Sequence, residues 1–177
     1  MKLVRTLTEL ERQQTELLPQ GLRELYDGDL KFPQSSPTLD RPYVFANFVS
    51  TLDGVVSFRV EGQSGGSSIS GSDPGDRFIM GLLRASADAV ILGANTVHEV
   101  SPEALFIPEY TYPDAKHLFA DYRLNALNKR EYPLVVVVSG GGKMELNRAI
   151  FQSPNVPTLV LRHQRGKWNS RRQAQQD

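Results

Sequence analysis

Apolar positions in the middle of the chain follow two different patterns, one typical of helices and one typical of strands. Residues 78–83 carry Phe78, Ile79, Leu82 and Leu83 at the spacing of one helix face. Unbroken apolar runs at 89–92 (AVIL), 134–138 (LVVVV) and 157–161 (PTLVL) predict short strands. The stretch 82–97 therefore has the pattern of a helix that leads into a strand and then into a new helix or turn.

The helix that starts near residue 73 has the clearest boundary signals in the chain. Asp73 can cap it, Pro74 takes its first position, and Asp76 favours the positive end of its dipole. Arg77 and Arg84 are seven residues apart and share a face away from the apolar stripe. Arg77 is either a solvated surface arginine or, together with nearby backbone N–H groups, part of an anion site.

The strand at 89–92 stops at Gly93, and a new helix or turn follows at Asn95 and Thr96. A strand, a glycine and a helix start in this order can place backbone N–H groups against a phosphate. An ordinary core strand with its turn has the same pattern, so both interpretations stay open at this point.

A second apolar segment, 43–50 (YVFANFVS), is rich in β-branched and aromatic residues without clean alternation, which predicts a central strand buried on both faces. Asn47 inside it either braces neighbouring backbone or faces a ligand, because a buried amide needs hydrogen-bond partners. Asp53 and Gly54 then predict a turn, with a plain hairpin into residues 55–60 as the simplest role for Asp53.

Two longer connections follow the predicted strands. Residues 61–72 hold four glycines and five serines and predict a loop of a kind that often contacts ligands. The long run 98–132 is irregular and proline-rich, with one helix expected over 113–123 that turns Leu118, Phe119 and Tyr122 inward.

The ends of the chain differ in character from its middle. Residues 1–40 predict a helical arm and linker, with one short helix before Pro19 and a second one, carrying Leu22, Leu25 and Tyr26, after it. We expect a domain over 41–162 and a basic tail over 163–177, which is either a disordered tail or a nucleic-acid-binding arm.

Composition narrows the function classes. Twenty basic and twenty acidic residues give no net charge, so we expect neither nucleic acid nor a membrane as partner. The chain has no cysteine, and its three histidines lie far apart, which argues against thiol and metal chemistry. Without a signal peptide or an apolar span, the expected compartment is the cytoplasm. No pairing singles out a nucleophile and its base, so no catalytic side chain is predicted.

Three segments in consistent order resemble the reductase domain of bacterial riboflavin biosynthesis, a member of the dihydrofolate reductase-like family. They are RPYVFANFVSTLDG at 41–54, ISGSDPGDRFIMGLLRASADAVILGANTV at 69–97 and VVVS at 136–139. The resemblance covers about residues 41–162. It implies an α/β fold with a mixed, mostly parallel sheet flanked by helices, a homodimer, and NADPH-dependent hydride transfer to a small molecule. The implied substrate is a pyrimidine or pteridine-like compound, in the pathway case a ribosylamino-pyrimidine phosphate.

The resemblance also implies site residues. The backbone around Val49 would meet the nicotinamide amide, and Thr51 to Asp53 would border the place where cofactor and substrate face each other. The implied cofactor-binding residues are Val49, Thr51, Gly93, Ala94, Thr96, Ser139 and Gly140. Within this set, Gly93, Ala94 and Thr96 would receive the pyrophosphate, and Ser139 would lie near the adenosine. The implied substrate-binding residues are Asp53, Ser68 and Arg77, of which the last two match positions that hold a sugar phosphate.

This chain departs from the family pattern in two places. The run HEVSPE at 98–103 lacks the substrate-binding arginine that pathway enzymes carry, so the substrate stays open. After PTLVL the chain continues as RHQRGKWNSRRQAQQD instead of further strands, which predicts a C-terminally shortened fold. The alternative function is therefore a catalytically inactive relative that binds a ligand or serves as a scaffold.

Overall fold

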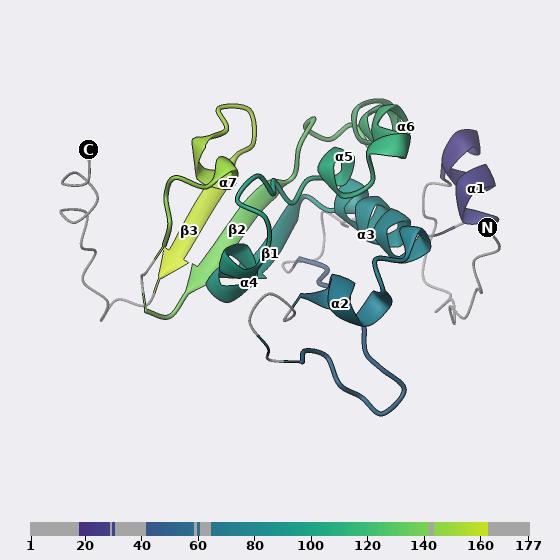
Figure 1. Cartoon of the computed structure of the whole chain (residues 1–177). Coiled ribbons are helices and arrows are strands. Elements are labelled where there is room, and N and C mark those ends of the chain that lie inside the picture. Colours follow the sequence, from purple (N-terminus) through teal and green to yellow (C-terminus); the bar gives the residue numbers. More distant parts are fainter. Residues whose placement is uncertain are drawn as a thin grey trace.

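A three-stranded parallel sheet lies beside a group of helices (Figure 1). The computed structural model describes residues 18–28, 30, 42–58, 60, 65–141 and 144–162. The strands β1 (Ala89–Gly93), β2 (Leu134–Ser139) and β3 (Thr158–Arg162) lie side by side in chain order. In their register Ile91 lies beside Val136, and Val136 beside Leu159. The three strands predicted from unbroken apolar runs are confirmed, and so is the α/β fold with a sheet flanked by helices.

The helices lie beside the sheet, and along the chain they precede β1 or connect successive strands. Before β1 come α1 (Gln20–Tyr26), α2 (Gly66–Ser70) and α3 (Pro74–Ser86). Between β1 and β2 the chain forms α4 (Ala94–Glu99), α5 (Pro108–Thr111), the 3-10 turn η1 (Pro113–Ala115), α6 (Lys116–Asp121) and the π-helical turn η2 (Tyr122–Ala126). The helix α7 (Ala149–Gln152) precedes β3. No helix in these described stretches is long and apolar enough to span a bilayer.

The helix α3 begins as its sequence predicts. The Asp73 side chain accepts a hydrogen bond from the Asp76 N–H at 3.0 Å, and Pro74 takes the first helical position. Phe78 and Leu82 are buried, as expected for the apolar stripe. The caps and the stripe are local signals, and together they determine where α3 starts and which face it buries.

The opposite face of α3 differs from its prediction, because α5 covers it. Arg84 donates to the Thr111 hydroxyl, and its guanidinium lies 5.6 Å from the centre of the Phe106 ring. Burial lowers the pKa of Arg84 to about 10, so it stays charged at neutral pH. Arg77 donates from Nε to the Thr111 carbonyl at 3.1 Å. Both arginines therefore attach α5 to α3, although they were expected to face away from the packed side.

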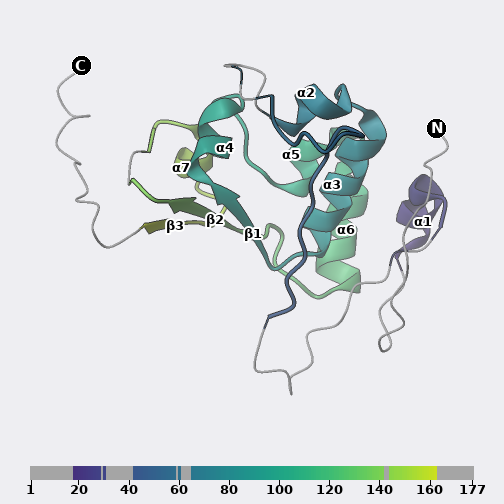
Figure 2. The same ribbon diagram turned by 90° about the horizontal axis from the view of Figure 1, so that it is seen from below.

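A helical core lies to one side of the sheet. In both views α1, α3 and α6 are grouped together, and β1 to β3 lie apart from them with α4 and α7 (Figure 1 and Figure 2). Leu18, Leu22 and Tyr26 pack with side chains of α3 and α6, including Phe78 and Phe119. The second predicted helix of the N-terminal arm is thus confirmed, and it packs on the domain. The first predicted helix and most of the linker lie outside the described residues.

A second core covers one face of the sheet. Val135 and Val137 of β2 pack against Val97 of α4, Ile150 of α7 and Val156. On the opposite face of the sheet, four apolar side chains are between 45% and 66% exposed: Ile91, Val138, Leu159 and Leu161. The sheet is therefore covered on one face and open on the other within the described part of the chain.

The carbonyl end of α3 is closed by two cations. The buried Arg123 guanidinium donates from Nη1 to the carbonyls of Ala85 at 2.8 Å and Ala87 at 2.7 Å, and from Nε to those of Arg130 and Glu131. Lys129 adds a hydrogen bond to the Ser86 carbonyl at 2.6 Å. Cations at this end of a helix also complement its dipole. Arg123 thereby fixes the end of α3, just before β1, to the segment that leads into β2.

The predicted central strand at 43–50 is wrong. No residue from 42 to 58 forms a strand, and several side chains are open to solvent, among them Phe48 at 82% and Leu52. A strand needs a neighbour that pairs with its N–H and C=O groups, and apolar composition alone does not supply one. The hairpin into 55–60 is likewise absent from its described residues. Its turn is confirmed, because the Gly54 N–H donates to the Thr51 carbonyl at 3.0 Å.

Two predicted connections contain more helix than expected. Residues 66–70 of the Gly/Ser-rich loop form α2, which ends at Gly71 with φ +63°, a conformation that glycine adopts without strain. The helix expected over 113–123 is present as η1, α6 and η2, with Phe119 and Tyr122 buried. Glycine and serine lower helix propensity without forbidding a short helix in a packed setting.

We predict that Arg123→Met lowers the free energy of unfolding by about 3 kcal/mol or more, since it leaves several buried carbonyls without their hydrogen-bond donor. Chemical denaturation would measure the loss. Arg130→Met is the matched control, because the Arg130 side chain is exposed and only its carbonyl takes part in this contact. Equal stabilities of the two variants would contradict the role given to Arg123.

Candidate functional site

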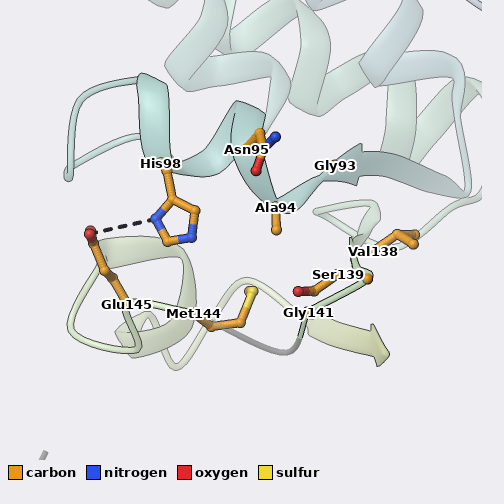
Figure 3. A pocket seen from close by; sticks show the side chains of 10 residues that line it. Gly93, Ala94, Asn95, His98, Val138, Ser139, Gly141, Met144 and Glu145 are labelled. Carbon is orange, nitrogen blue, oxygen red and sulfur yellow. Dashed lines mark ion pairs between the residues drawn. The ribbon is translucent and has the colours of Figure 1, made fainter. Parts of the chain in front are cut away.

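A pocket opens where β1 and β2 end (Figure 3). Its volume is about 660 Å³, within the range of small-molecule sites. It is lined by Gly93, Ala94, Asn95, His98, Val138, Ser139, Gly140, Gly141, Met144 and Glu145. In α/β proteins ligands bind at the carboxyl ends of parallel strands, so this is the expected place for a site.

One wall of the pocket is the junction of β1 with α4. Gly93 ends the strand, and α4 begins at the next residue. A Cβ built on Gly93 meets no atom within 4 Å, so this backbone is open to a ligand. Gly93 pairs with Val138, which brings the end of β2 beside it. The same openness holds at Gly140, directly after the buried Ser139.

The facing wall consists of His98 on α4 and residues 144–145 after β2. The imidazole Nδ1 of His98 lies 3.6 Å from Oε1 of Glu145 (Figure 3). A proton carried on Nδ1 would point toward this carboxylate. The two side chains come from separate elements and form one polar edge of the pocket.

Arg148 holds this polar edge in place. It is buried and donates from Nε to Oε2 of Glu145 at 2.7 Å. Its Nη groups donate to three carbonyls at the end of α4, those of Val97, His98 and Val100, at 2.7 to 2.9 Å. One guanidinium therefore both caps α4 and orients the pocket carboxylate.

The electrostatics of this edge follow from the same contacts. The hydrogen bond from Arg148 lowers the pKa of Glu145, and the charges of Arg148 and His98 act in the same direction. Glu145 is therefore ionised at neutral pH. The neighbouring guanidinium balances this charge, so the carboxylate adds no uncompensated negative charge to the pocket.

The structure brings four predicted cofactor residues together in this pocket: Gly93, Ala94, Ser139 and Gly140. Thr96 lies on the same helix as Ala94, but it is exposed and does not belong to the lining. The junction of β1 with α4 and the end of β2 were recognisable from the sequence because both are marked by an apolar run that stops at a small residue.

The other predicted site residues lie outside this pocket. Val49 contacts the start of α2, with its Cγ1 3.0 Å from where a Cβ at Gly66 would lie. The Thr51 hydroxyl donates to the Asp53 carboxylate and accepts from the Val55 N–H, so both side chains serve the local turn. Ser68 belongs to α2, and Arg77 is bound to the Thr111 carbonyl. Their roles toward substrate and nicotinamide stay predictions.

Sequence reasoning missed the facing wall. In the sequence His98 is one of three scattered histidines, and Glu145 is one of twenty acidic residues. Neither has a spacing signal in the sequence, because their meeting depends on Arg148, which binds carbonyls of a helix far away in the chain.

Comparison with known proteins identifies the family. The family model described as RibD C-terminal domain matches residues 42–174, which is more than half of the chain. A search of curated proteins found no match. The matched range contains the pocket, the three described strands and all the site residues predicted above.

We predict that Arg148→Lys lowers the free energy of unfolding by about 2 kcal/mol, because one ammonium group cannot replace the planar fork that binds Glu145 and three carbonyls. Hydrogen exchange should quicken at α4 more than at α3. Arg23→Lys, on the exposed side of α1, is the matched control. Unchanged exchange at α4 would show that Arg148 does not hold this helix.

Proposed function

Because the chain belongs to the family of RibD C-terminal domains, we propose that it is an NADPH-dependent reductase of small molecules. The family is one of reductases of riboflavin biosynthesis. The proposed substrate is a pyrimidine or pteridine-like compound, with the ribosylamino-pyrimidine phosphate of that pathway as the first candidate. The proposed compartment is the cytoplasm.

The observation that carries this proposal is the open backbone at the ends of β1 and β2. A dinucleotide needs close approach to backbone N–H groups, and Gly93 and Gly140 leave room for it. The residues present thus fit the group. The backbone from Gly93 to Thr96 would receive the pyrophosphate, and Ser139 with Gly140 would border the adenosine. When bound, NADPH supplies the hydride.

The protein's own contribution to such a reaction is orientation. Hydride transfer requires that donor and acceptor carbons face each other with water excluded, so no nucleophile or metal is needed. In this proposal Val49 and Thr51 border the nicotinamide, and Asp53 borders the substrate. Ser68 and Arg77 hold the sugar phosphate. Arg77 would bind the phosphate through its Nη groups, because its Nε donates to the Thr111 carbonyl.

We predict that Gly93→Asp weakens NADPH binding at least tenfold, since it adds a negative charge where the pyrophosphate would lie. A Cβ at this position meets open space, so the substitution leaves the packing intact. Titration followed by cofactor fluorescence would measure the affinity. Gly93→Asn, of equal size and no charge, is the matched control.

The same titration tests the proposal as a whole. No NADPH binding by the natural sequence up to millimolar concentration would refute it. Binding without turnover of any pyrimidine or pteridine substrate would instead support the inactive, ligand-binding alternative. Turnover that is lost in Gly93→Asp and retained in Gly93→Asn would support the reductase.

We further propose a homodimer that covers the open face of the sheet. Parallel sheets are almost always covered on both faces, and here Ile91, Leu159 and Leu161 remain exposed on one of them. A stable interface buries roughly 800 Å² per partner. In a two-fold dimer this face would meet its own copy.

We predict that Ile91→Lys converts the dimer into monomers, because it places a charge on the open face, within the proposed contact. Light scattering coupled to size-exclusion chromatography would give the mass. Gln20→Lys adds the same charge at an exposed position of α1 and should leave the mass unchanged. A monomeric natural protein at micromolar concentration would contradict the dimer.

A further inference from the structure

The pocket contains two ionisable side chains among its described lining residues, His98 and Glu145. Glu145 is hydrogen-bonded to Arg148, whose charge balances its own. His98 is then the one lining residue in the described part of the chain that can present a positive charge to a ligand. Among these lining side chains, His98 is therefore the one that could bind an anionic group of a ligand.

The imidazole of His98 is held in a defined orientation. Its Nδ1 faces Glu145 at 3.6 Å, and its side chain is 30% exposed. Figure 3 shows the second ring nitrogen on the side of Met144 and Ser139, toward the interior of the pocket. With Nδ1 turned toward the carboxylate, the ring places Nε2 on the ligand side.

Arg148 fixes both partners of this pair. It binds the His98 carbonyl through Nη2 at 2.8 Å and the Glu145 carboxylate through Nε at 2.7 Å. The backbone of the histidine and the side chain of its partner are thus tied to one buried group. Such support is what a side chain needs if it is to distinguish two similar ligands.

We propose that His98, positioned by Glu145 and Arg148, contacts the ribose 2′ position of the bound dinucleotide and makes this chain prefer NADPH over NADH. The inference rests on the proposed function, which puts the pyrophosphate at Gly93 and the adenosine at Ser139. From there the wall formed by His98 and Glu145 is the next surface along the pocket. A 2′-phosphate is the one charged difference between the two cofactors, and an imidazole N–H can donate a hydrogen bond to it.

The test compares NADPH and NADH affinities of the full chain and its variants by fluorescence titration. His98→Gln should reduce the ratio of NADPH to NADH affinity about tenfold, the loss expected for one hydrogen bond to a charged group. Glu145→Gln should reduce the same ratio by a smaller factor, because it loosens the orientation of the ring without removing it. His117→Gln, at an exposed position of α6, is the matched control.

Three outcomes would overturn the inference. If His98→Gln weakens both cofactors equally, the residue supports the pocket and does not distinguish the cofactors. If the ratio is unchanged in both variants, the 2′ position is recognised elsewhere, while the proposed function stands on the binding itself. If the natural sequence binds neither cofactor, this inference and the proposed function fail together.

Discussion

Two buried arginines close the helices on either side of β1, and the arrangement of the fold depends on them. Arg123 takes carbonyls at the end of α3, and Arg148 takes carbonyls at the end of α4. Helix ends leave such groups without partners, and a helix as short as α4 does not persist on its own. Arg123 precedes β2 and Arg148 precedes β3 in the chain. Each guanidinium therefore joins the surroundings of β1 to the approach of another strand.

The same arrangement places the pocket. Arg148 reaches the end of α4 and the Glu145 carboxylate with one guanidinium, so the stability of the helix and the geometry of the facing wall are coupled. The other wall needs no such device, because parallel register alone brings Gly93 beside Val138. A small sheet can in this way offer a defined pocket while its opposite face stays open to solvent.

Local signals explain how much of this fold was predictable from the sequence. Asp73, Pro74 and the apolar stripe identified α3, and unbroken apolar runs identified three strands. The failures share a physical cause. The segment 43–50 has the composition of a buried strand, but composition cannot show whether a neighbouring strand is available. Likewise, the sequence places Arg84 on the face of α3 away from the apolar stripe, because α5, much later in the chain, leaves no trace in the periodicity of the helix.

The candidate site likewise contains residues that local sequence signals mark and residues that only long-range contacts bring together. Gly93, Ala94, Ser139 and Gly140 lie at strand ends, and a strand end is marked locally by the residues that stop it. In the proposed function such positions would bind the groups common to all dinucleotides, the pyrophosphate and the ribose rings. His98 and Glu145 meet only through the long-range contacts of Arg148, which no local pattern records. Side chains of this second kind can change without disturbing the strands, and for that reason the distinction between similar ligands is expected to lie with them.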